Sequence, residues 1–231
     1  MHQVERLDWE AHKAFVRPVD VDYTTDALTH TKVRVLDVIA AEAPAGYGEV
    51  HVVDKVVGFK KIKLHTHENV GYGDVTLPPF ELHTRGLWLD PRGPTGQTAL
   101  AAWRAAWVEG VARAAYSLEN VATLLVLCEP GDVGRAIGEA SAERLGRIYL
   151  YDTLAGGSGF AERLYEARAD LVARATRLVE GCACLRGCPG CIGPIPPPLE
   201  DIGPSRSPTA KQAALGILRS LLRDLAAEAP P

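Results

Sequence analysis

The first ninety residues alternate between apolar or β-branched positions and polar ones, a pattern typical of β-strands with one buried face. Residues 48–67 extend this pattern and predict a long hairpin or a bent strand pair, with Gly58 at its bulge or turn. Residues 69–74 are rich in glycine and predict turn and loop. The other strands predicted in this part are residues 15–23, 32–40 and 83–89.

From residue 97 the apolar residues recur every three or four positions, which predicts a helix over residues 97–118. Trp103 and Trp107 share its apolar stripe, so we expect them in the core rather than on a ligand-binding surface. The next run, residues 121–128, is too short for its pattern to distinguish a strand from a buried helix. Residues 132–146 contain three glycines and mixed charge, and they predict loop or irregular helix.

A strand is predicted at residues 147–152, and the glycine-rich turn at 156–159 opens a second long helix with an apolar stripe from Phe160 to Leu178. The free backbone N–H groups at the start of such a helix resemble a phosphate-binding turn in outline. No Lys-Ser or Lys-Thr pair follows the glycines, so the turn is not a Walker A loop. The interpretation that we favour is that the glycines permit tight packing between strand and helix.

Four cysteines lie within ten residues after this helix, as Cys182-x-Cys184-x3-Cys188-x2-Cys191. At this spacing four thiolates can converge on one tetrahedral zinc ion, although iron also occupies such sites. Two disulfides would need an oxidising compartment, and a redox-active Cys-x-x-Cys opens a helix instead of following one. We therefore predict a structural zinc knuckle. The fifth cysteine, Cys128, is predicted to be an inert buried thiol.

These patterns predict an α+β fold, with an N-terminal β-rich part followed by a helical part that carries the four-cysteine zinc knuckle. Ser207 and Pro208 form a favourable cap and first-turn pair for a last helix, whose leucine-rich face must dock on another element. The expected parts are a β-rich part at 1–95, an α/β zinc-binding part at 96–193, a proline-rich linker at 194–208 and a C-terminal helix at 209–231.

Charge and hydropathy narrow the class of protein further. The chain has 25 Lys and Arg against 29 Asp and Glu, a net charge of −4 at pH 7, so any DNA contact must come from a local patch. No run approaches the roughly 20 apolar residues of a membrane span, and residues 1–15 lack the apolar core of a secretory leader. We expect a soluble, cytoplasmic protein with no membrane partner.

The one basic stripe of the chain has the sequence FKKIKLH. A period of two places Phe59, Lys61, Lys63 and His65 on one strand face and Lys60 on the other. The first face, with its aromatic ring and lysines, suits a phosphate backbone and one stacked base. A solvated strand edge carries lysines just as readily. All five residues are candidate DNA contacts.

Histidines suggest a second metal site. His65 and His67, followed by Glu68 and with His83 later in the chain, place two rings on one side of a strand. No third ligand has a convincing local position, so we favour polar surface histidines.

Several stretches together resemble one family, the C-terminal region of MrfA-like superfamily 2 helicases, which carries a zinc-binding domain. The similarity is spread over most of residues 3–193, and it rests on the stretches together rather than on any one of them. The stretches are VRPVDVDY at 16–23, YGEVHV at 47–52, GFKKI at 58–62, THEN at 66–69, HTRGLW at 83–88, YD at 151–152, GGSGFAE at 156–162, and the four cysteines.

The resemblance implies a zinc-stabilised accessory domain of an ATP-dependent 3′-to-5′ DNA helicase of the DNA-repair type. It also implies that the metal ligands are Cys182, Cys184, Cys188 and Cys191. The chain has no Walker A or Walker B motif, so we expect no enzyme activity of its own, and ATP with Mg²⁺ would bind only to a motor in cis or in trans.

We therefore expect a non-catalytic module that binds or guides DNA, in single-stranded form, and supports the motor. The alternative is a protein-interaction subunit that docks a separate helicase motor without binding DNA. A zinc hydrolase is disfavoured, because four cysteine ligands leave no open position for water.

Overall fold

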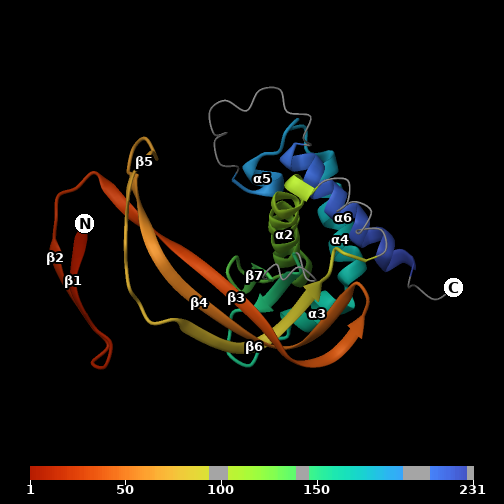
Figure 1. Ribbon diagram of the computed structural model, residues 1–231, viewed down its shortest axis with the longest axis horizontal. Helices are drawn as coiled ribbons and strands as arrows, with labels where there is room; N and C mark the ends of the chain where they lie inside the picture. Colours follow the sequence, from red (N-terminus) through yellow and green to blue (C-terminus); the bar gives the residue numbers. More distant parts are fainter. Residues whose placement is uncertain (94–103, 139–145, 195–208, 228–231) are drawn as a thin grey trace. The chain divides into compact units, whose positions relative to one another are not determined.

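The computed structural model describes residues 1–93, 104–138, 146–194 and 209–227 (Figure 1). The chain divides into two compact units, and the division runs through two long strands that both units share. These strands are β3 (Tyr23–Glu42) and β4 (Ala45–Lys63). The first unit is residues 1–30 and 55–79, and the second is residues 31–54 and 80–231.

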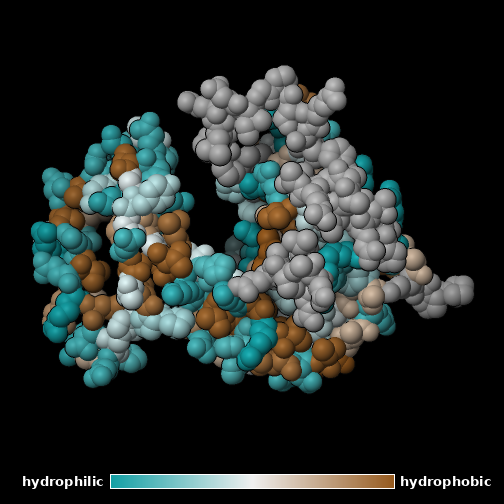
Figure 2. Space-filling model, viewed as in Figure 1, coloured by the Kyte–Doolittle hydropathy of each residue, from teal (hydrophilic) through white to brown (hydrophobic). Residues whose placement is uncertain are grey.

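The first unit consists of strands with almost no interior. Within residues 1–30 and 55–79, which are all described, only Gly58 is buried. Apolar residues lie among polar ones at its surface (Figure 2). The aromatic side chains of Trp9 and Tyr72 are also exposed there. Its smaller strands are β1 (His2–Asp8), which pairs antiparallel with β2 (Lys13–Pro18), and β5 (Asn69–Gly73), which pairs antiparallel with the end of β4.

Two predictions for this region were wrong. Residues 48–67 do not form a hairpin, because β4 runs without a break to Lys63 and the turn follows it. Gly58 lies inside that strand, where an added Cβ would come within 3.0 Å of the carbonyl oxygen of Gly73. The lack of a side chain at Gly58 therefore allows β4 and β5 to approach closely, and it does not mark a turn. Residues 69–74 were predicted as loop, but most of them form β5.

The second unit contains the buried part of the sheet. Its strand order is β3-β4-β6-β8-β7, and the neighbours β4–β6, β6–β8 and β8–β7 are antiparallel. The predicted strands at 83–89 and 147–152 are confirmed. The prediction of loop or irregular helix at 132–146 was wrong over β7, where Gly134 lies beneath the ring of Tyr151 and leaves room for it. The strands are β6 (Phe80–Leu89), β7 (Val133–Ile137) and β8 (Ile148–Asp152).

Alternate residues of these strands enter two separate clusters. Leu87 and Leu89 of β6 pack with helix residues in the main core, whereas Trp88 packs with Tyr149 and Tyr151 in a second cluster. Because successive strand side chains point to opposite faces, the helices cover one face of the sheet. They are α2 (Arg104–Val126), α3 (Phe160–Glu166), α4 (Arg168–Gly181), α5 (Pro189–Ile192) and α6 (Ala210–Ala227).

Helix α2 extends beyond the predicted range and ends at Val126, so most of the run at 121–128 is the end of a helix, with Val121 and Val126 buried and Leu124 exposed. Trp107 is buried as predicted, while Trp103 lies outside the described residues. The second predicted helix is divided in two at Ala167, where φ is −94° and ψ is 17°. Leu171 and Ala175 of the predicted stripe are buried after this break, but at the end of the stripe Val179 is buried and Leu178 is 37% exposed.

Helix α6 is confirmed, and Leu218 and Leu221 of its leucine-rich face are fully buried in the main core, against α2 and α4. Thr209 caps this helix through hydrogen bonds with Gln212. The predicted cap pair, Ser207 and Pro208, and most of the predicted linker lie outside the described residues. The α+β class is confirmed: strand-rich sheets precede a helical part with four clustered cysteines. None of the described helices combines the length and the apolar character that crossing a membrane would require.

Candidate functional site

The four knuckle cysteines, at 182, 184, 188 and 191, are brought together by the end of α4 and by α5. Cys182 ends α4 with extended backbone angles, and Cys188 precedes α5 in a similar extended conformation. Cys191 lies within α5 and is 1% exposed. The four Sγ atoms lie within 4.8 Å of one another.

This geometry fits a tetrahedral metal ion. The Sγ separations are 3.6 Å for Cys182 and Cys188, 3.5 Å for Cys184 and Cys191, and 3.6 Å for Cys188 and Cys191. Four sulfurs at about 2.3 Å from a central zinc ion are about 3.8 Å apart. A disulfide joins its sulfurs at about 2.05 Å, and all four thiols are free. The cysteines are therefore positioned for zinc binding.

The thiols of the knuckle differ in acidity. Hydrogen bonds from Cys182 and from backbone N–H groups lower the pKa of the Cys188 thiol to about 7. Burial raises the pKa of the Cys191 thiol to about 12, and burial also raises the pKa of Cys184. Since a metal binds thiolates, loading this site releases protons.

Three side chains from other helices hold the backbone of the knuckle. The Lys211 ammonium of α6 donates to the carbonyl oxygens of Cys182 at 2.6 Å and Cys184 at 2.9 Å. The Ser117 hydroxyl of α2 donates to the carbonyl oxygen of Cys191 at 2.6 Å. Arg113, also on α2, donates to the carbonyl oxygen of Pro194. None of these three roles was predicted from the sequence, because the partners are backbone carbonyls far along the chain.

The glycine-rich turn at 156–159 holds a carboxylate of the chain itself. The side chain of Asp152 is fully buried and accepts hydrogen bonds from the backbone N–H groups of Ser158 at 2.6 Å, Gly159 at 2.9 Å and Ala161 at 2.9 Å. Gly157 has φ +92°, and an added Cβ would meet Arg85 at 2.7 Å. The packing interpretation is supported, because the groups suited to a phosphate already bind Asp152.

The basic stripe lies where β4 pairs with β5. Lys60 forms an ion pair with Asp26 at 2.9 Å, on the face opposite Lys61. The Lys61 ammonium lies 5.2 Å from the centre of the Tyr23 ring. Lys63 is the last residue of β4.

The aromatic and histidine members of the stripe have other surroundings. The Phe59 ring covers Gly73 of β5, since an added Cβ there would come within 2.3 Å of the ring. His65 is exposed and follows the end of β4, so it belongs to the turn rather than to the strand face.

The histidines do not gather into a metal site. Among the described residues, the four cysteines form the one group of three or more potential ligands that converge. His83 instead packs edge-on against His51, with ring centres 4.7 Å apart, and His51 contacts Glu81 at 3.0 Å. Cys128 is half-buried rather than buried, and burial raises the pKa of its thiol, which agrees with low reactivity.

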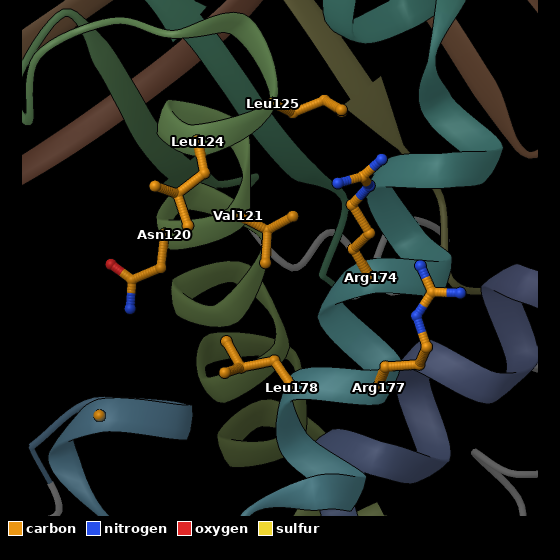
Figure 3. A pocket seen from close by; sticks show the side chains of 8 residues that line it. Asn120, Val121, Leu124, Leu125, Arg174, Arg177 and Leu178 are labelled. Carbon is orange, nitrogen blue, oxygen red and sulfur yellow. The ribbon is translucent and has the colours of Figure 1, made fainter.

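A groove of about 500 Å³ opens beside the knuckle, between α2 and α4 (Figure 3). Leu124, which is 76% exposed, and Leu178, which is 37% exposed, line it together with Gly190 of α5. Arg174 and Arg177 extend from α4, and both contact Asp170, at 2.7 and 3.9 Å. The lining is mainly aliphatic and includes no aromatic residue among those described.

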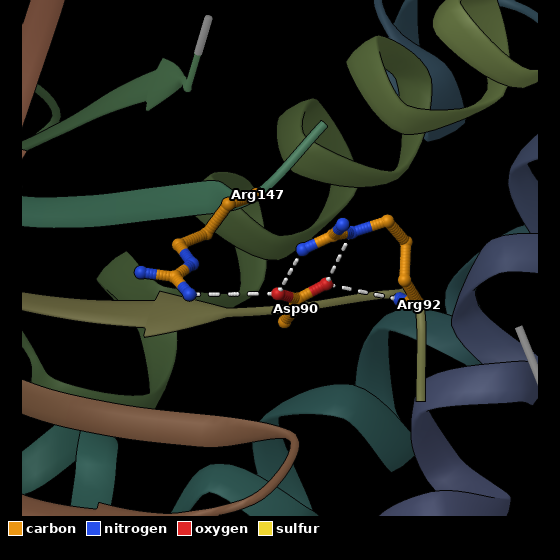
Figure 4. Close-up of polar contacts among 3 residues, drawn as sticks. All are labelled: Asp90, Arg92 and Arg147. Carbon is orange, nitrogen blue, oxygen red and sulfur yellow. Dashed lines mark hydrogen bonds and ion pairs between the residues drawn. The ribbon is translucent and has the colours of Figure 1, made fainter. Parts of the chain in front are cut away.

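A separate ion-pair cluster joins β6 to β8 (Figure 4). Asp90 bonds Arg92 at 2.7 Å and Arg147 at 3.5 Å. Burial opposes ionisation of Asp90, but the hydrogen bonds and charge of the two arginines outweigh it and lower the pKa of the carboxyl group. The cluster is a structural link between strand ends.

Comparison with known proteins gives a consistent result. Residues 114–192 match the family model of the MrfA Zn-binding domain. The chain is 35% identical over 201 residues to the uncharacterized ATP-dependent helicase YprA of Bacillus subtilis, which covers 83% of the chain and 26% of that protein. It is 23% identical over 207 residues to the ATP-dependent helicase HRQ1 of Saccharomyces cerevisiae, covering 82% of the chain and 19% of that protein.

Solved structures show the same relationship. A crystal structure of the DUF1998 helicase MrfA bound to DNA matches with a TM-score of 0.60 and 32% identity, over 95% of this chain and 28% of that one. A further crystal structure of MrfA matches with a TM-score of 0.55 and 30% identity, over 83% of this chain and 26% of that one. The chain thus spans about a quarter of the length of the helicases that it resembles.

Proposed function

The chain carries an MrfA Zn-binding domain and is a relative of MrfA-like helicases, and on this basis we propose that it is a non-catalytic, zinc-stabilised module of an ATP-dependent DNA helicase. In this role it binds or guides single-stranded DNA and supports a motor that works in 3′-to-5′ direction in DNA repair. ATP and Mg²⁺ belong to that motor. The observation that carries the proposal is the convergence of four thiols, within 4.8 Å of one another, inside the matched domain.

Zinc has a structural role in this proposal. Cys182, Cys184, Cys188 and Cys191 would be its four ligands, and the sulfur separations of 3.5–3.6 Å support this assignment. Four thiolates complete the coordination shell, so the ion supplies folding free energy rather than a reactive water. Free thiols also suit a reducing compartment, which supports a cytoplasmic location.

The DNA-contacting residues are proposed to be those of the basic stripe. Lys61 and Lys63 carry the main phosphate contacts, since Lys60 is already paired with Asp26. Phe59 and His65 are proposed as secondary contacts at the same end of β4. The similarity to a helicase whose crystal structure contains DNA supports DNA as the ligand.

A charge reversal tests the stripe. In the double variant Lys61→Glu and Lys63→Glu, the affinity for an oligo(dT) probe falls, and the slope of log affinity against log salt becomes shallower by about 1.4, since each lost single-strand phosphate contact removes about 0.7. The matched control reverses Lys13 and Arg17 of β2, with the same change of charge in the same unit. Equal effects of the two double variants, or no effect of either, would reject the stripe.

The alternative function, docking of a helicase motor without DNA binding, is favoured by the groove between α2 and α4. An aliphatic lining with exposed leucines suits a protein segment better than nucleic-acid bases, which stack on aromatic rings. Arg174 and Arg177 both contact the single carboxylate of Asp170, so the rim of the groove carries a net positive charge. Such a rim suits an acidic segment of the motor. The relatives hold about three quarters of their length outside the matched part, which provides such a segment.

Leu124→Glu tests this docking. Binding of the motor, measured by titration of purified components or by domain-resolved hydrogen exchange in a fused chain, weakens at least tenfold. Leu154→Glu, at a residue that is 62% exposed elsewhere in the second unit, is the control. If Leu124→Glu leaves motor binding intact, the groove is not the docking surface.

A further inference from the structure

The start of α6 is held by interactions that fix its position. Thr209 and Gln212 form a reciprocal cap: the backbone N–H of Gln212 donates to the Thr209 hydroxyl at 3.2 Å, and the backbone N–H of Thr209 donates to the Gln212 side chain at 2.9 Å. Lys211 lies between them, in the first turn of the helix. A cation there is disfavoured by the positive end of the helix dipole, so its presence needs a compensating partner.

The zinc knuckle supplies that partner. The Lys211 ammonium bonds the carbonyl oxygens of Cys182 and Cys184, at 2.6 and 2.9 Å. The backbone N–H of Lys211 donates to the carbonyl oxygen of Arg186, at 3.1 Å. The knuckle therefore accepts one of the free N–H groups of α6, and α6 satisfies two carbonyls of the knuckle.

These contacts lie close to the proposed ligands. Cys182 and Cys184 are two of the four, and no helix or strand includes residues 183–187, so their backbone depends on outside support. A zinc ion held by four thiolates carries a net charge of about −2, which a nearby ammonium offsets. Lys211 also lies outside the residues that match the MrfA Zn-binding domain, which end at 192.

We propose that Lys211 is a positioning residue of the zinc site, and that zinc binding and docking of the start of α6 strengthen each other. The inference rests on the proposed role of the knuckle as a zinc site. Coupling of this kind is reciprocal: the factor by which docked α6 raises zinc affinity equals the factor by which zinc favours docking. The C-terminal helix thus completes a metal site whose ligands all precede it.

Zinc affinity is the first test. Competition with a chromophoric chelator on the full chain gives a zinc dissociation constant that rises 10- to 100-fold in Lys211→Met, as expected when an outer-shell partner of a metal ligand is lost. Lys211→Arg, which keeps the charge and the donors, retains affinity within a few-fold of the wild type. Lys55→Met, at an exposed lysine of the first unit, leaves affinity unchanged. Affinity of Lys211→Met within twofold of the wild type overturns the proposal.

Hydrogen exchange tests the reciprocal effect. Zinc slows exchange in the first turns of α6 in the wild type, and most of this zinc-dependent protection is lost in Lys211→Met. Lys211→Arg keeps it, which separates a positioning role from general loss of folding. If zinc does not change exchange in wild-type α6, the coupling is wrong. A wild-type chain that holds no zinc would instead reject the proposed function itself.

Discussion

Strand β4, like β3, belongs to both units, and its side chains have opposite environments in the two. In the second unit Val50 and Val52 are almost fully buried, whereas Val57, in the first unit, is 53% exposed. The second unit encloses a core and a set of free thiols, while the first buries only Gly58. Stability therefore resides in the second unit, and the first is a surface whose apolar and charged side chains are available for contact.

The largest difference in stability between the two units is expected when the knuckle is disrupted. Cys188→Ser removes one zinc ligand, and because structural zinc sites supply on the order of 10 kcal/mol of folding free energy, the second unit loses much of its stability. Hydrogen exchange resolved along the chain should show faster exchange in α5 and the start of α6, with little change in β1 and β2. Cys128→Ser is the matched control. Equal loosening of β1 and β2 would show that the two units are not separate in stability.

A matched pair of core and surface substitutions sharpens the contrast. Leu118 of α2 is fully buried, so Leu118→Ala should lower the free energy of unfolding by about 2–5 kcal/mol. Val57→Ala, in the first unit, should change it by less than about 0.5 kcal/mol. Denaturant unfolding of both variants measures the difference. Comparable losses would contradict the view that only the second unit has a packed core.

Removing the charge of a buried carboxylate in the second unit should cost more stability than removing that of an exposed carboxylate in the first. Asp152 accepts three backbone N–H groups at the start of α3, so Asp152→Asn leaves at least one buried donor unsatisfied and should cost about 1–3 kcal/mol. Asp26 is largely exposed and pairs with Lys60, so Asp26→Asn should cost less than about 1 kcal/mol. Thermal unfolding in low salt checks the order, and a larger effect of Asp26→Asn would reverse the interpretation.

The smallest expected effect is the pH dependence of zinc binding, which involves only residues of the second unit. At pH 7 the thiols of Cys184 and Cys191 are protonated, because burial raises the pKa of each, and Cys188 is about half ionised because its pKa is about 7. Zinc binding should therefore release at least two protons per ion, and zinc affinity should rise as pH rises. Calorimetry in buffers of different ionisation enthalpy measures this number. Release of less than one proton would contradict the assigned ligands.

Local patterns predicted much of this structure. The spacing of the four cysteines is a local signal, and the structure brings all four sulfurs together. The continuous apolar run at 147–152 and the helical period of the leucines in α6 are strong local signals, and both elements form where expected. These features depend on residues close in sequence.

The features that were missed depend on partners far along the chain. Gly134 suggests a loop in the sequence, but in the structure it makes room for the ring of Tyr151. Gly58 suggests a turn, but it lies inside a strand that closely approaches β5. Lys211 is an ordinary helix residue in the sequence, and its role depends on carbonyls 29 and 27 residues away. Backbone acceptors leave no trace in side-chain patterns, which is why this support for the knuckle was not predicted.

We propose that a zinc ion held by the four cysteines stabilises the second unit, and elemental analysis of the metal content of the purified chain tests this proposal. We expect one zinc per chain in the wild type and in Cys128→Ser, and almost none in Cys188→Ser. A wild-type chain without zinc, or a Cys188→Ser chain that keeps a full equivalent, would contradict it.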